Sequence, residues 1–186
     1  MPNHASLLAA AERVASLLAD RGVDAVLIGA AALAAHRYVR HTEDIDLGVS
    51  IAIRDLESVA DGLREAGYAV EVREPDGQDP LGGVLDVIGP AGLVQIVNFG
   101  ERFPTVIDSG HAEATLRVRS GASLRIIPLA HLIALKLYAG GMKSKADIVE
   151  LLKRNPDADH DGIRSLCRRY RLRGLEPLIR EAHATG

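Results

Sequence analysis

The chain has 186 residues, 47% of them apolar, with a formal net charge of −3 and a single cysteine. This length suits one domain, or a core with a small appended unit, and no apolar run approaches the roughly 20 residues that a membrane span needs. One cysteine excludes an internal disulfide and indicates a cytoplasmic protein, and the N-terminus lacks the positive charge that opens a signal peptide.

The first forty residues predict a helix, a strand and a second helix. Apolar residues recur at helical spacing over 7–18, and Gly22 follows them where a left-handed cap ends a helix. The apolar run 26–28 predicts a strand that stops at Gly29, and the small residues of 30–38 predict a helix directly after it. We expect the first helix to cover the sheet to which this strand belongs.

Two carboxylates on the next predicted strand are the first candidates for chemistry. Residues two apart on a strand point to the same side, so Asp44 and Asp46 face one way while Ile45 faces the core. Two like charges side by side repel each other unless a cation lies between them. Mg²⁺, with Mn²⁺ as an alternative, takes oxygen ligands of this kind together with substrate phosphates. The pair therefore predicts a metal site, although a solvated strand end is the simpler alternative.

The turn before this strand adds a second half to the predicted site. Gly29 and Ala30 open the small-residue helix, and backbone N–H groups at a helix N-terminus form a natural phosphate cradle. Metal-binding carboxylates opposite a phosphate cradle are the arrangement that phosphoryl or nucleotidyl transfer requires.

The middle of the chain alternates short apolar runs with glycine and proline, which is typical of strands and turns. The expected elements are, in order, a helix at 56–63, a half-buried strand at 68–73, a loop at 74–80, the two strands of a hairpin at 83–88 and 93–99, a loop or short helix at 109–115, and a second hairpin at 116–119 and 123–127. Together with the strands before it, this region predicts an α/β (α+β) core over residues 1–127, with a mixed sheet flanked by helices.

The last third of the chain predicts a helical C-terminal part over residues 128–186. Pro128 stands where a helix tolerates its missing N–H, and residues 129–139 are apolar on nearly every side, which implies a buried helix. Further helices are expected at 143–154, 163–170 and 175–182.

Charge is distributed unevenly between the two parts. Residues 143–186 hold 10 Lys/Arg and 7 Asp/Glu, a net charge of +3, whereas residues 1–142 hold 12 and 18, a net charge of −6. A basic C-terminal part is compatible with a polyanionic partner such as RNA, and a solvated helical surface is the alternative.

Three further side chains are candidates for the site. Lys136 lies in the apolar helix, so its ammonium must either reach the surface or meet an anion such as a triphosphate. Asp147 lies among basic residues near the start of the next helix, where it could favour the helix dipole, or could orient Lys136 or a substrate group. Arg40 precedes the carboxylate pair and is a candidate phosphate contact.

Four motifs in this order resemble those of a known family. They are G-A-x-A-L-x-x-H from Gly29, R-x-T-x-D-I-D-L over 40–47, L-I-A-L-K-L-Y-A over 132–139 and K-S-K-A-D-I from Lys143. Their order and spacing, over roughly residues 23 to 155, resemble the AbiEii/MenT-type nucleotidyltransferases of the DNA polymerase β-like nucleotidyltransferase superfamily.

The resemblance implies transfer of a nucleoside monophosphate from an NTP to an acceptor, with Mg²⁺ as cofactor. By position, Asp44 and Asp46 match the metal-binding carboxylates, Lys136 matches the triphosphate lysine, and Asp147 matches the last aspartate of its motif. Gly29 and Ala30 match the turn under the phosphates, with Ala30 in place of a second glycine or a serine.

Two features depart from the family pattern. Ser144 stands where the motif usually has its first aspartate. The third catalytic carboxylate has two candidates, Asp86 and Asn98, and an asparagine there would supply an oxygen but no charge and no base.

The residues predict a metal-dependent nucleotidyltransferase with an NTP as substrate and no membrane association. The resemblance implies that it acts on tRNA or another RNA as the toxin of a toxin–antitoxin pair, with a cognate antitoxin as partner. One alternative is an enzyme of the same fold with a small-molecule acceptor of the aminoglycoside type. The other is a non-catalytic nucleotide-binding module.

Overall fold

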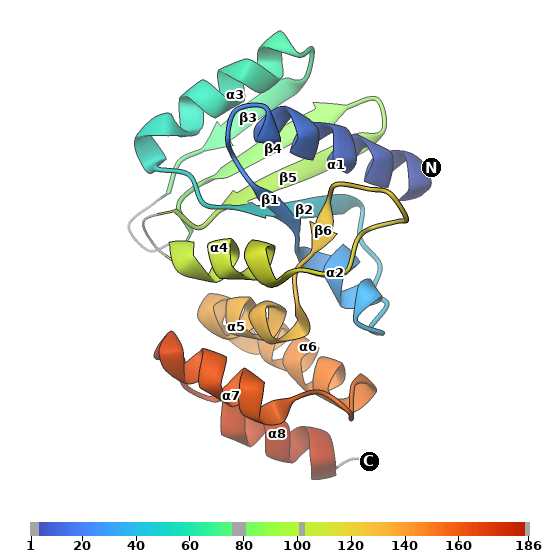
Figure 1. The fold of residues 1–186 in the computed structure, drawn as a ribbon, viewed down its shortest axis with the longest axis vertical. Coiled ribbons are helices and arrows are strands. Elements are labelled where there is room, and N and C mark those ends of the chain that lie inside the picture. Colours follow the sequence, from blue (N-terminus) through green and yellow to red (C-terminus); the bar gives the residue numbers. More distant parts are fainter. Residues whose placement is uncertain (1–3, 76–80, 101–102, 185–186) are drawn as a thin grey trace.

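The computed structural model of the chain describes residues 4–75, 81–100 and 103–184 (Figure 1). The helices are α1 (His4–Ala19), α2 (Gly29–Ala35), the 3-10 helix η1 (Ile53–Asp55), α3 (Leu56–Glu65), α4 (Pro104–Glu113), α5 (Leu129–Ala139), α6 (Gly141–Arg154), α7 (His160–Arg169) and α8 (Leu175–Ala184). The strands are β1 (Ala25–Leu27), β2 (Asp44–Val49), β3 (Ala69–Arg73), β4 (Val84–Gly89), β5 (Gly92–Asn98) and β6 (Arg125–Ile126).

The strands form one mixed sheet in the order β3-β4-β5-β2-β1-β6. Strand β2 is parallel to β5 and β1 is parallel to β6, while the other neighbouring pairs are antiparallel. The predicted fold class, an α/β core with a mixed sheet flanked by helices, is therefore confirmed.

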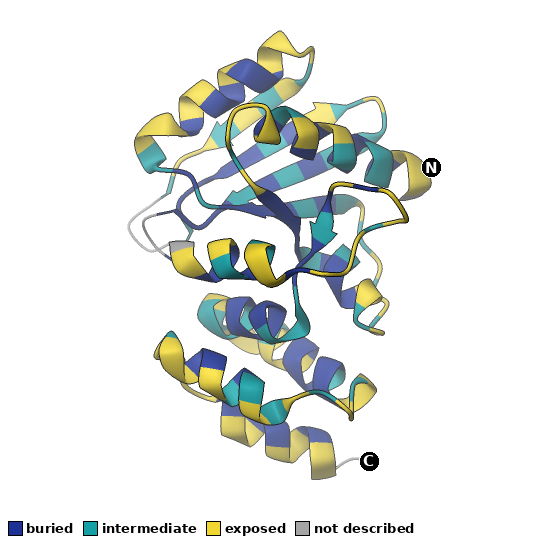
Figure 2. Cartoon of the chain, viewed as in Figure 1, coloured by how far each residue is buried: buried dark blue, intermediate teal, exposed yellow. Residues whose placement is uncertain are grey.

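The two faces of the sheet differ in how they are covered. Helices α1 and α3 cover one face, beneath which Leu47, Leu85 and Ile96 are almost fully buried. On the other face α4 packs over β1 and β2, where Ile107 lies against Gly48. Among the described residues, no helix packs closely on the β3–β4–β5 part of this second face, where Ile88 is 51% exposed. Figure 2 shows these strands with teal and yellow residues between the dark blue ones.

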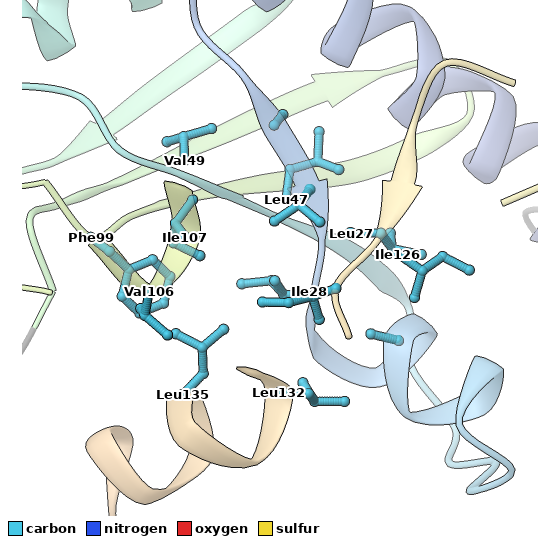
Figure 3. Close-up of a cluster of buried hydrophobic side chains, with 14 of the residues drawn as sticks. Leu27, Ile28, Leu47, Val49, Phe99, Val106, Ile107, Ile126, Leu132 and Leu135 are labelled. Atoms are coloured by element: carbon cyan, nitrogen blue, oxygen red, sulfur yellow. The ribbon is translucent and has the colours of Figure 1, made fainter. Parts of the chain in front are cut away.

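The C-terminal helices α5 to α8 lie together beyond one end of the sheet (Figure 1). Helix α5 joins them to the core, because Leu132 and Leu135 point into the cluster that contains Ile28 and Ile107 (Figure 3). The predicted burial of this helix is correct, and Lys136 is thereby held on an element that packs against α4 and contributes to the core cluster.

Two predictions for the region between β5 and α5 are wrong. The loop or short helix expected at 109–115 has the wrong bounds, because its residues 109–113 form the second half of a ten-residue helix, α4, which runs from Pro104 to Glu113. The hairpin expected at 116–119 and 123–127 is reduced to a single bridge between Arg117 and Arg125, because β6 pairs instead with β1. Part of the loop predicted at 74–80 lies outside the described residues.

Within the described ranges, no helix combines the length and the apolar character that crossing a membrane requires.

Candidate active site

Asp44 and Asp46 lie on β2 on the side opposite Ile45, which is 4% exposed in the core. The Thr42 hydroxyl, just before the strand, donates a hydrogen bond to Asp44 Oδ1. The two carboxylates therefore share one face at the start of the strand, as the sequence predicts.

The Asp46 carboxylate lies directly against the turn that opens α2. Gly29 has a φ of +63°, and a Cβ atom built there would overlap the carboxylate of Asp46. The backbone N–H of Ala30 donates a hydrogen bond to the same carboxylate. Gly29 is therefore needed here both for its left-handed backbone and for the close approach of Asp46.

Burial and like charge act together on Asp46. The pKa of its carboxyl is raised to about 6, first because the group is buried and second because Asp44 lies beside it. Lys136, the Ala30 N–H and Arg40 favour the charged form but do not offset these two effects. The charged form of Asp46 is therefore unfavourable beside Asp44, and a bound cation would stabilise it.

Lys136 and Arg40 both bind a third carboxylate, Asp147. Lys136 Nζ lies 2.7 Å from Asp147 Oδ2, and the Arg40 guanidinium lies 3.2 Å from each Asp147 oxygen. Asp147 is only 2% exposed, so its charge depends on these two cations. The sequence leaves open whether Asp147 favours the helix dipole or orients Lys136 or a substrate group. In the structure it contacts Lys136, and Arg40 binds the same carboxylate.

The two candidates for a third carboxylate lie elsewhere. Asn98 is fully buried and holds the chain at Ile51, Gly82 and Gly100, accepting from two N–H groups and donating to two carbonyls. Asp86, on β4, is bound by Arg73 and by Gln95 of the strand between it and β2. Among the described residues, no group of three His, Cys, Asp or Glu side chains could hold a metal ion.

Solved structures with similar folds are known. An antigenic nucleotidyltransferase-like protein from Paracoccidioides brasiliensis matches with a TM-score of 0.56 and 16% identity, over 96% of this chain and 94% of that chain. The solution structure of the antibiotic-resistance factor ANT(2'')-Ia matches with a TM-score of 0.54 and 16% identity, over 92% of this chain and 93% of that chain. The chain has a nucleotidyltransferase fold. No protein-family profile and no curated protein matches the sequence.

The residues of this nucleotidyltransferase fold fit a hard divalent cation. Asp44 and Asp46 supply oxygen ligands, which Mg²⁺ and Mn²⁺ prefer, and burial together with the neighbouring charge of Asp44 raises the pKa of Asp46. Lys136 and Arg40 act on Asp46 from the neighbouring cluster. A nucleotide's phosphates and a metal ion could therefore meet here.

One residue of this site was missed by sequence reasoning. Gln95 on β5 stands directly opposite Asp46 on β2, and it binds Asp86 on its other side. A glutamine in an apolar strand has no motif of its own. Only the alignment of β5 beside β2, which is a long-range property, brings Gln95 next to the carboxylate pair.

Proposed function

We propose that this protein is a metal-dependent nucleotidyltransferase that moves a nucleoside monophosphate from an NTP to an acceptor and releases pyrophosphate. One observation carries the proposal. The Asp44–Asp46 pair lies within electrostatic reach of a second cluster, in which buried Asp147 holds Lys136 and Arg40. Carboxylates for a metal ion and fixed cations for phosphates are the parts that nucleotidyl transfer needs.

In this proposal Asp44 and Asp46 would hold Mg²⁺ or Mn²⁺, and the ion would supply positive charge to the phosphates. Lys136 and Arg40 bind the β- and γ-phosphates, and Asp147 keeps both cations oriented toward them. Gly29 and Ala30, whose turn contacts the Asp46 carboxylate, lie on the phosphate side of the site in this proposal. Asp147 acts through its neighbours, so it is a positioning residue.

For the acceptor we propose tRNA or another RNA, with the protein as the toxin of a toxin–antitoxin pair and an antitoxin as its partner. The net charge of +3 over residues 143–186 supports an RNA partner. The resemblance of the four motifs to AbiEii/MenT-type nucleotidyltransferases supports the toxin role.

A specific observation favours a second acceptor class. Glu71 and Asp86 continue the row of Asp46 and Gln95 across the open face of the sheet. Asp86 is paired with Arg73, so the exposed Glu71 and the Asp44–Asp46 pair supply the negative charge here, and that charge suits a cationic, hydroxyl-rich small molecule better than a polyanion. An acceptor of the aminoglycoside type is therefore the second candidate.

One experiment separates these functions. The protein is incubated with Mg²⁺ and NTPs labelled at the α-phosphate, with either total tRNA or an aminoglycoside as acceptor. Label on tRNA supports the first acceptor class, and label on the aminoglycoside supports the second. Asp46→Asn should abolish either product, while Asp157→Asn, an exposed aspartate between α6 and α7, should leave it unchanged. Bound nucleotide without labelled product would instead indicate a non-catalytic module.

A further inference from the structure

Strand register brings one row of side chains together across four strands. Asp46 on β2 pairs with Gln95 on β5, Gln95 pairs with Asp86 on β4, and Asp86 pairs with Glu71 on β3. Directly opposite residues on neighbouring strands point to the same face, and such strands lie about 4.8 Å apart. Gln95 is therefore the nearest side chain of this row to Asp46, and Asp86 lies one strand farther away.

The hydrogen bonds of Asp86 determine which way the Gln95 amide points. Asp86 Oδ1 accepts from Gln95 Nε2 at 2.7 Å and from the Arg73 guanidinium at 2.8 Å. An ionised carboxylate can only accept hydrogen bonds, so the amide nitrogen must be the atom that faces Asp86. The amide is planar, and the carbonyl oxygen of Gln95 is consequently left on the side away from Asp86. In the described parts of the chain, no hydrogen bond to that oxygen is found.

We propose that Gln95 Oε1 is the third protein oxygen of the metal site, and that Asp86, itself held by Arg73, is the residue that positions it. The inference rests on the proposed function, since the cation is the one that Asp44 and Asp46 would hold. An amide oxygen is a hard ligand that Mg²⁺ and Mn²⁺ accept. It adds coordination without adding a third negative charge beside two carboxylates that already repel each other.

This arrangement also gives Asp86 a role in the site without direct contact with the ion. A carboxylate two strands from Asp46 is separated from the pair by the intervening strand, but it acts through the Gln95 amide as partners of metal ligands commonly do. Arg73 in turn is 51% exposed along its side chain and holds the Asp86 carboxylate.

The test measures Mn²⁺ affinity rather than turnover. Free Mn²⁺ is followed by electron paramagnetic resonance in titrations of the wild type, Gln95→Met, Asp86→Ala and the double variant. Gln95→Met, close in size to glutamine, removes both amide atoms. We expect it to raise the Mn²⁺ Kd about tenfold, with a similar rise for Asp86→Ala. The double variant should bind no more weakly than Gln95→Met alone, because Asp86 acts only through Gln95.

The matched control changes Glu71, the outermost carboxylate of the row. Glu71→Ala removes one negative charge from the next position of the same row, and it should change the Kd by less than about twofold. An unchanged Kd in Gln95→Met, with unfolding curves that show an intact fold, would overturn the inference. So would a further loss in the double variant, which would make Asp86 a direct ligand.

Comparison of Asp46→Asn with Gln95→Met separates the role of Gln95 from the proposed function. Mn²⁺ binding that is lost in Asp46→Asn but unaffected in Gln95→Met would overturn only the role of Gln95. A wild-type protein that binds no Mn²⁺, alone or with an NTP, would overturn both.

Discussion

Asp46 lies partly buried against the Gly29–Ala30 turn, and its pKa of about 6 exceeds the ordinary aspartate value of 3.8. The folded protein therefore binds a proton at Asp46 more tightly than the unfolded chain does. Between pH 4 and pH 6 the folded state holds more protons, so stability from this group falls as pH rises and stays lost above pH 6. A cation bound to Asp46 would restore this lost stability, and it is the same cation that the proposed chemistry needs.

Asp46→Asn should raise the stability of the metal-free protein at neutral pH although it abolishes the proposed activity. In the absence of metal at pH 7.5, we expect the variant to be more stable than the wild type by about 1 to 3 kcal/mol, because each pKa unit corresponds to 1.36 kcal/mol. The difference should disappear below pH 4, where the wild-type carboxyl is protonated in both states. Urea unfolding at the two pH values in EDTA measures it. A variant less stable than the wild type at pH 7.5 would contradict the assigned cause of the pKa shift.

Gly29→Ala should weaken metal binding as well as destabilise the fold. A left-handed alanine costs about 1 to 2 kcal/mol, and the new Cβ would also displace the Asp46 carboxylate. We expect a loss of stability together with at least about tenfold weaker Mn²⁺ binding. Gly22→Ala is the matched control, since Gly22 has a φ of +73° with nothing within 4 Å of an added Cβ. It should lose stability alone, and weaker metal binding in it would argue against a specific role for Gly29.

Asn98 offers a prediction that distinguishes a structural amide from a metal ligand. Asn98→Asp would place a carboxylate oxygen against the carbonyls of Ile51 and Gly82, which now accept from its amide nitrogen. We expect a loss of about 3 kcal/mol in thermal or urea unfolding, since two buried bonds become repulsive contacts. Mn²⁺ affinity should be unchanged. Tighter binding in this variant would return Asn98 to the metal site.

At the level of elements, Lys136 on α5 and Asp147 on α6 contact each other, and Asp147 also binds Arg40 in the loop before β2. Lys136→Met leaves buried Asp147 with one cation, and we expect a loss of about 2 kcal/mol, less than the roughly 3 to 5 kcal/mol for a buried charge left without any partner. The NTP KM should also rise, because a phosphate contact is removed. Lys153→Met is the matched control on the surface of α6, where Lys153 pairs with Glu150 at 3.7 Å, and it should change neither quantity appreciably. An unchanged KM in Lys136→Met would remove Lys136 from the nucleotide site.

Elements with a local signal could be predicted from the sequence. Ile45 between two aspartates indicated a strand with one polar face, and the apolar residues around Lys136 indicated a buried helix. The strand predicted at 123–127 contains β6, but its partner could not be predicted, because β6 pairs with β1, about a hundred positions earlier. The same limit applies to Gln95 and to Asn98, since register and buried hydrogen bonds depend on contacts between distant segments.

At the level of the whole molecule, several contacts tie the C-terminal helices to the sheet. Leu132 of α5 packs in the core cluster of Figure 3. His36 Nε2, after α2, lies 2.8 Å from the carbonyl oxygen of Ile127, and Asn155, after α6, donates to the His36 carbonyl. The Asp147 cluster adds an ion pair between the same parts. The division into a core of residues 1–127 and a helical part of 128–186 stays a prediction, and these contacts indicate that the two parts are energetically coupled.

Heat unfolding should therefore show one transition. Leu132→Ala removes a side chain that is 1% exposed, and we expect a loss of about 3 kcal/mol and a single transition lowered by roughly 6 to 12 °C. Differential scanning calorimetry measures both. Two separate transitions in the wild type, or a shift confined to one of two transitions in the variant, would show that the parts unfold independently.

We propose that Asp44, Asp46 and the Lys136–Asp147–Arg40 cluster form one site that cleaves an NTP between its α- and β-phosphates. The most direct measurement follows two labels, one at the α-phosphate and one at the γ-phosphate, in the presence of Mg²⁺ and of either tRNA or an aminoglycoside as acceptor. We predict the γ label in pyrophosphate and the α label on the acceptor, with both products lost in Asp46→Asn. A γ label released as orthophosphate, or products that Asp46→Asn leaves unchanged, would contradict the claim.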